Sequence, residues 1–312
     1  MNRIRLSAIL LPVLVMSLVM VPLPVLAGNP GDAALLSLRM GVGAREAGMG
    51  ETGVASSTGG TALFWNPANN VFADFKTELI LQHNRYLGLF NHEAAAVAHR
   101  VGRGVLGFTF MGFYSDDIDR HTLDSGVNVF EGTFKPYDVA FGVSYAHPLG
   151  DRFAVGAGAK LIYEKIDFYS DTGFAFDFFI THQAVIEGLV FAASATNLGG
   201  QMNLRDQPFD LPTAVRLGAA YTPASDFLQG KLTMTGEVLL PQDTTEKAHL
   251  GLEYRLIPEL ALRFGSRINY DTQGITAGAG FVAGSLRLDY AYEDMTEEGF
   301  DDGNKISLGM TW

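Results

Sequence analysis

The sequence predicts an all-β protein: a transmembrane antiparallel β-barrel of about 14 strands, with an N-terminal hatch segment folded into its lumen as a plug. Three observations support this prediction. The chain starts with an export signal. It has no further apolar run long enough for a membrane helix. From Thr77 onward it divides into segments of roughly ten residues with alternating polarity, separated by turn residues.

The first residues have the pattern of a secretory signal peptide. Arg3 and Arg5 precede an apolar run from Leu6 to Val25, and a small residue, Ala27, ends it. A retained transmembrane helix is the alternative, but three prolines interrupt the run and no basic stop-transfer residues follow. We therefore expect cleavage near Ala27.

The sequence is therefore divided into a signal peptide over 1–27, a hatch segment over 28–76 and a transmembrane barrel over 77–312. In an exported chain without further membrane helices, a closed barrel satisfies every backbone group in lipid. The predicted location is the outer membrane of a Gram-negative-type bacterium, where the outer-membrane lipid is its first partner.

Charge and cysteine content exclude several functions. Loss of Arg3 and Arg5 with the signal changes the formal charge from −12 to −14, which argues against nucleic acid as a partner. The chain has no Cys, which excludes disulfides, thiol catalysis, Cys-based metal sites and a lipid-modified mature N-terminus.

Alternation identifies the strands individually. Tyr137, Val139, Phe141, Val143 and Tyr145, for example, alternate with small and polar residues. A soluble β-sandwich would also alternate, but here the polar face is rich in small residues with charges of both signs, and aromatics lie near the strand ends as in membrane girdles. Charged residues assigned to the inner face include Lys160, Glu164, Arg263, Arg267, Arg287 and Asp289. The predicted strands are 77–86, 91–100, 104–114, 137–147, 152–166, 172–182, 188–197, 212–222, 231–240, 247–255, 259–268, 273–282, 285–293 and 304–312.

The connections between these strands follow the rule for outer-membrane barrels, with short turns at the periplasmic end and longer loops outside. If the first strand runs outward, the short links 101–103, 148–151, 256–258 and 283–284 are periplasmic. The longer links 115–136, 198–211 and 294–303 are then outer loops.

The segment before the first strand is dense in small residues and contains two motifs. The first includes Gly43, Ala44, Arg45, Gly48, Met49 and Gly50, and the second Ala62, Leu63, Trp65, Asn66, Pro67 and Ala68. Glycine permits close approaches and turns that other residues forbid. A flexible linker is the alternative, but linkers lack apolar anchors such as Trp65. We expect Arg45 to bond to carboxylates in the lumen, in a structural role.

In these motifs the chain resembles the PorV/PorQ family of outer-membrane proteins, relatives of the FadL channels. The resemblance implies a barrel of 14 strands with a hatch, and two alternative functions. PorV-like members receive exported proteins and deliver them to components of the type IX secretion system. FadL-like members pass long-chain fatty acids or other hydrophobic small molecules through the barrel. The leading expectation is a role in protein secretion or surface assembly, and the channel is the alternative.

Signatures of catalysis are missing from the sequence. The seven His residues are scattered, and no nucleophile elbow, phosphate loop or dinucleotide fingerprint is present. We expect no enzyme activity, no cofactor and no metal site. Two acidic clusters are interpreted as solvated loop charge rather than calcium sites. They are Asp116, Asp117 and Asp119, and Glu293, Asp294, Glu297, Glu298, Asp301 and Asp302.

The C-terminus predicts assembly by barrel-insertion machinery. Its last strand is apolar at Leu308 and Met310 and ends in the aromatic Trp312. This resembles the signal by which such machinery recognises its clients. Interfacial anchoring is the alternative role for Trp312.

Overall fold

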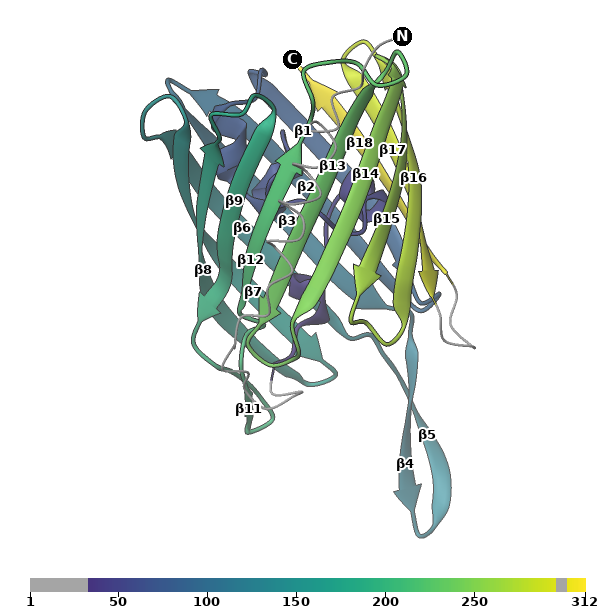
Figure 1. The fold of residues 1–312 in the computed structure, drawn as a ribbon. Coiled ribbons are helices and arrows are strands. Elements are labelled where there is room, and N and C mark those ends of the chain that lie inside the picture. The colour runs from purple at the N-terminus through teal and green to yellow at the C-terminus, as the bar shows by residue number, and fades with distance from the viewer. Residues whose placement is uncertain (1–32, 296–301) are drawn as a thin grey trace.

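In the computed structural model, which describes residues 33–295 and 302–312, the chain forms one closed antiparallel barrel (Figure 1). The predicted signal peptide lies outside the described residues. Fourteen strands make the barrel. They are β1 (Thr77–Tyr86), β2 (Phe90–Val101), β3 (Gly104–Ser115), β6 (Tyr137–Pro148), β7 (Phe153–Ile166), β8 (Tyr169–Gln183), β9 (Leu189–Gly199), β12 (Ala214–Tyr221), β13 (Lys231–Pro241), β14 (Lys247–Ile257), β15 (Leu260–Ile268), β16 (Gln273–Ala283), β17 (Leu286–Met295) and β18 (Gly303–Thr311).

Every barrel strand pairs with its neighbours along the chain, and β18 returns to pair with β1. Leu81 lies opposite Leu308 in that closing ladder, and Glu78 lies opposite Thr311. The prediction of about fourteen strands in a closed barrel is confirmed, and each predicted boundary lies within three residues of the observed one. One closed sheet also excludes the two-sheet sandwich.

The two faces of the barrel wall differ as the alternation predicts. Large apolar side chains point outward and are exposed, as in β6, where Phe141, Val143 and Tyr145 are all about half accessible. Charged residues of the same sheet point inward and are buried, among them Arg263 and Asp289. An apolar outer belt is what lipid contact requires of a transmembrane barrel. Within the described residues, no helix has the length and apolar character needed to cross a bilayer.

The two ends of the barrel are unequal. We call the end with both barrel termini the turn end, drawn at the top of Figure 1, and the opposite end the loop end. The two longest connections of the described part, 116–136 and 200–213, both lie at the loop end. This is the asymmetry predicted from the sequence.

The predicted outer loop 115–136 is not an open loop. It forms a hairpin of β4 (Ile118–Asp124) and β5 (Val127–Phe134) that extends away from the barrel (Figure 1). Its base is fixed because Arg120 forms an ion pair with Asp167 and lies 4.4 Å from the ring centre of Phe168. The connection 200–213 similarly contains a small hairpin of β10 (Met202–Leu204) and β11 (Gln207–Phe209).

Residues 33–76 precede the barrel and lie inside it, where short helices are visible in purple in Figure 1. Their elements are η1 (Leu36–Arg39), α2 (Ala44–Gly48), α3 (Ala62–Trp65) and η2 (Pro67–Val71). Helix α2 packs against β15 to β18, and η2 packs against β3, β6, β7 and β8 on the other side. The segment therefore contacts both halves of the wall.

Candidate functional site: two cavities and the contact between them

The first sequence motif lies against the inner face of β14, β15 and β16. The backbone nitrogen of Gly50 donates to the Thr276 hydroxyl at 3.0 Å. The carbonyl of Gly50 accepts from Nδ1 of His249 at 2.6 Å. One residue of the segment is thus held by two different wall strands, and both bonds are buried.

Glycine is required on both sides of this contact. Gly50 has φ +69°, and a Cβ there would lie 2.6 Å from the Leu250 carbonyl oxygen. Across the contact, a Cβ on Gly265 would lie 2.6 Å from the Cα of Gly50. Two backbones therefore touch with no side chain between them, which only glycine allows. We call this the glycine contact, formed by Met49 and Gly50 against Gly265.

An ionic cluster lies on the turn-end side of the glycine contact. Arg45 of α2 bonds to Glu253 through Nε at 2.9 Å and Nη2 at 3.1 Å. Arg263 bonds to the same carboxylate at 2.7 Å and lies 2.8 Å from Asp289. Arg45 thus meets a lumen carboxylate, as its sequence context predicts. Because these charges are desolvated, each depends on its partners for stability.

The second motif joins α3 to η2 and contacts the opposite wall. The side chain of Asn66 donates to the Thr181 hydroxyl at 2.9 Å and accepts from the Ala68 nitrogen at 3.0 Å. Pro67 occupies the first position of η2, where its missing N–H costs nothing. The Trp65 ring nitrogen donates to the Val42 carbonyl at 2.7 Å. Hydrogen bonds therefore link the second motif to the wall at Thr181 and to Val42, which directly precedes the first motif.

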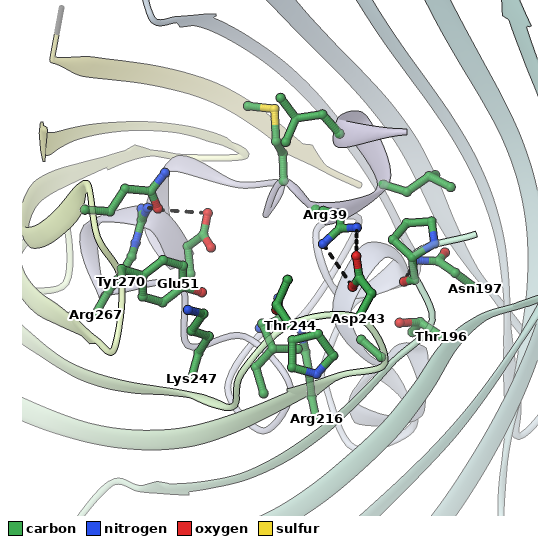
Figure 2. A pocket seen from close by; sticks show the side chains of 18 of the residues that line it. Arg39, Glu51, Thr196, Asn197, Arg216, Asp243, Thr244, Lys247, Arg267 and Tyr270 are labelled. Atoms are coloured by element: carbon green, nitrogen blue, oxygen red, sulfur yellow. Dashed lines mark hydrogen bonds and ion pairs between the residues drawn. The ribbon is translucent and has the colours of Figure 1, made fainter. Parts of the chain in front are cut away.

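A cavity of about 270 Å³ lies on the loop-end side of the glycine contact. In Figure 2 it is the space encircled by Arg39, Glu51, Lys247 and Tyr270. One part of its lining is apolar and comes from the segment after Ala34 and from β13. These apolar residues are Leu36, Leu38, Met40, Leu239 and Pro241.

Another part of the lining of this loop-end cavity is charged. Glu51 lies 3.7 Å from both Arg267 and Lys305, and Glu293 lies 3.5 Å from Lys305 and also pairs with Arg267. Burial raises the pKa of Glu51, but the positive charges of Arg267 and Lys305 outweigh it and hold the pKa at about 2. The carboxylate is therefore ionised at neutral pH.

Two further contacts define the cavity. Arg39 of η1 forms an ion pair with Asp243 at 2.5 Å, which connects the N-terminal segment to the β13–β14 loop (Figure 2). Burial and the nearby Glu51 carboxylate raise the pKa of Tyr270. Its hydroxyl therefore stays protonated and donates to Nε2 of His249 at 3.0 Å.

A second cavity of about 520 Å³ lies on the turn-end side, lined by the Arg45 cluster and by β12 to β17. The order along one strand separates the two cavities. On β15, Arg263 lines the turn-end cavity, Gly265 makes the glycine contact and Arg267 lines the loop-end cavity. The glycine contact therefore lies between two spaces inside one barrel.

The other candidate residues are placed as follows. Leu308 and Met310 point outward on β18, and Trp312 is exposed at the turn end. The backbone N–H of Gly43 donates to the side-chain oxygen of Gln82. Ala44 lies buried beside Ala291, and Gly48 approaches the backbone of Gly278.

One of the two acidic clusters differs from its prediction. In the first, the charges are solvent-exposed as predicted: Asp116 pairs with Arg85, and Asp117 lies 3.8 Å from Lys135. In the second, Glu293 is a buried lumen residue of β17 and not a solvated loop charge, because β17 continues to Met295 and directs it inward. Glu297, Glu298 and Asp301 lie outside the described residues.

Sequence reasoning missed the residues that define the loop-end cavity. Arg39, Glu51, Arg216, Lys247 and Tyr270 come from four separate parts of the chain. Their inward direction on strands follows from alternation for Arg216 and Lys247, but nothing in the sequence indicates their level along the barrel axis.

The comparisons with known proteins bear on the fold. No protein-family model and no curated protein matches the sequence. Among solved structures, the Ralstonia pickettii toluene transporter TbuX matches with a TM-score of 0.63 and 14% identity, over 87% of this chain and 98% of that one. The Pseudomonas putida toluene transporter TodX matches with a TM-score of 0.61 and 12% identity, over 86% and 96%. A Pseudomonas aeruginosa FadL homologue matches with a TM-score of 0.55 and 11% identity, over 86% and 97%.

The chain has a FadL-like barrel fold. At these identities the likeness concerns the fold alone. The comparisons do not support the secretion role that the PorV/PorQ resemblance implies.

Proposed function

We propose that this protein is an outer-membrane channel for hydrophobic small molecules, with residues 33–76 acting as its hatch. The arrangement of the two cavities carries the proposal. Two cavities on opposite sides of the glycine contact are separated by the packing of one segment, residues 33–76, against the wall. Passage then requires displacement of the N-terminal segment and no rearrangement of the barrel.

The fold supports the same function. TbuX and TodX are described as toluene transporters, and their barrels match nearly the whole of this one. The apolar lining from Leu36 to Met40 and from Leu239 offers contact to a hydrophobic solute in the loop-end cavity. The ionic cluster of Arg45 and Glu253 holds the hatch when no solute is passing.

A reversible crosslink between hatch and wall tests the proposal. The hydroxyls of Thr52 in the segment and Thr235 on β13 are 2.6 Å apart, so cysteines there place two sulfur atoms near bonding distance. Because the chain has no Cys, the pair Thr52→Cys and Thr235→Cys forms the sole possible disulfide. The single variant Thr52→Cys is the matched control.

The assay is toluene uptake into proteoliposomes by the mature protein. We expect uptake above that of protein-free vesicles, loss of uptake in the oxidised double variant, and recovery after reduction. Uptake that is equal in both redox states contradicts the hatch role. A wild-type protein that gives no uptake above protein-free vesicles contradicts the channel role.

A further inference from the structure

The loop-end cavity has a charge imbalance that the passage of neutral molecules does not need. Eight of its lining side chains are charged, and a ninth, Glu237, pairs with Arg216 at 2.6 Å just behind the wall. Among these nine residues of the described part of the chain, five are basic and four are acidic, so one positive charge is left over. The basic residues are Arg39, Arg216, Lys247, Arg267 and Lys305, and the acidic ones are Glu51, Glu237, Asp243 and Glu293.

The excess charge is at Lys247. The ion pairs among the described residues account for Arg39, Arg216, Arg267 and Lys305, and none of them includes Lys247. Its amine instead donates to the Asn269 carbonyl at 2.5 Å and lies 5.0 Å from the ring centre of Tyr270. The same amine also donates to the Thr245 hydroxyl at 3.3 Å. An ammonium with these neutral neighbours retains one donor for an anion.

Apolar and aromatic surface adjoins this amine. Lys247 pairs with Leu239 across β14 and β13, and Leu239 pairs with Arg216 across β13 and β12. The row places an apolar side chain between two basic ones, at strand spacings of about 4.8 Å. Pro241 and Tyr270 extend the apolar surface on either side. A ligand that fits this row has one negative group and a compact apolar body.

The cavity has room for such a body. Even if each non-hydrogen atom takes roughly the 30 Å³ of a water molecule in the liquid, a space of about 270 Å³ accommodates an aromatic ring with one carboxylate.

From the unpaired lysine, the apolar row and the volume, we infer that the loop-end cavity binds compact organic monocarboxylates, with aromatic carboxylates as the best-fitting class. The carboxylate accepts from Lys247, and the ring lies against Leu239 and Tyr270. This inference rests on the proposed channel function, for which it names the solutes that the loop end selects.

The test compares benzoate with benzamide, its neutral isostere, by calorimetric titration of the mature protein in detergent. We expect benzoate to bind at least about tenfold more tightly, because a hydrogen bond between two charged groups is stronger than one to a neutral amide. We expect Lys247→Met to remove this difference and leave benzamide binding unchanged. Lys76→Met, an exposed residue just before β1, is the matched control and should bind benzoate like the wild type.

Two results would overturn the inference: equal affinity of the wild type for benzoate and benzamide, or unchanged benzoate affinity in Lys247→Met. The wild-type comparison needs no variant, so it decides the question even if Lys247→Met does not fold. Toluene uptake separates the two proposals. Uptake without a benzoate preference removes the inference alone, whereas absence of uptake removes the channel function.

Discussion

Gly265→Ala is the sharpest single test of how the hatch is held. A Cβ at this position would lie 2.6 Å from the Cα of Gly50 and closer still to its nitrogen. Ordinary contact begins near 3.4 Å, so the segment must retreat by about 1 Å. The bonds from Gly50 to Thr276 and His249, now 3.0 and 2.6 Å, would then be broken or strained. With two buried bonds and overpacking, we expect a loss of about 3 kcal/mol.

The matched control is Gly156→Ala on β7. A Cβ there meets the Ala146 side chain at 3.4 Å and Pro67 at 3.5 Å, which is ordinary packing. Both substitutions add one methyl group to the lumen face of a strand, so they differ only in what the methyl meets. We expect the urea midpoint of Gly156→Ala to be close to that of the wild type.

Two measurements report the effect of Gly265→Ala. The midpoint of urea unfolding in detergent gives the change in the free energy of unfolding. Conductance across a planar bilayer should rise in Gly265→Ala, because the glycine contact lies between the two cavities. If Gly265→Ala and Gly156→Ala have the same midpoint and the same conductance, the glycine contact is not what separates the cavities.

Three further outcomes are expected. Arg45→Met should lower the free energy of unfolding by about 3 kcal/mol, measured by urea titration, since it leaves Glu253 with less compensation in a buried site; an unchanged midpoint would count against the ionic cluster. Because the folded pKa of Glu51 is lowered from 4.5 to about 2, its stabilisation is present above pH 4.5 and is lost as the pH falls toward 2. Glu51→Gln should remove this part of the acid dependence, and an identical pH profile would refute the assignment. Deletion of Leu308–Trp312 removes half of the β18 ladder to β1, so heat-modifiable gel mobility should be lost; a normally folded band would contradict the predicted insertion role.

Most of the barrel could be predicted because lipid and lumen impose opposite requirements on successive residues. Phe141 and Leu252 mark lipid-facing positions by residue type alone, and the period of two then fixes every neighbour. The β4–β5 hairpin was missed for the same reason. It leaves the barrel at Ile118, both of its faces are exposed, and no alternation between lipid and lumen is imposed on it.

The candidate site could be predicted only in part. The glycines of the first motif indicate a close backbone approach, but their partner Gly265 is one of many strand glycines and has no local signature. Arg39 and Glu51 acquire their roles from residues about 200 positions away, Asp243 and Arg267. Such pairings depend on the height of each side chain along the barrel axis, which strand tilt and register determine together.

The glycine contact has a consequence for how the hatch can move. Side chains at an interface can change rotamer and absorb a small shift, but Met49, Gly50 and Gly265 meet through main-chain atoms alone. Main chain cannot be rearranged locally without moving the residues attached to it. A displacement of Gly50 would therefore move α2 and Glu51 with it. The glycine contact and the ion pairs of Glu51 in the loop-end cavity would then form together and break together.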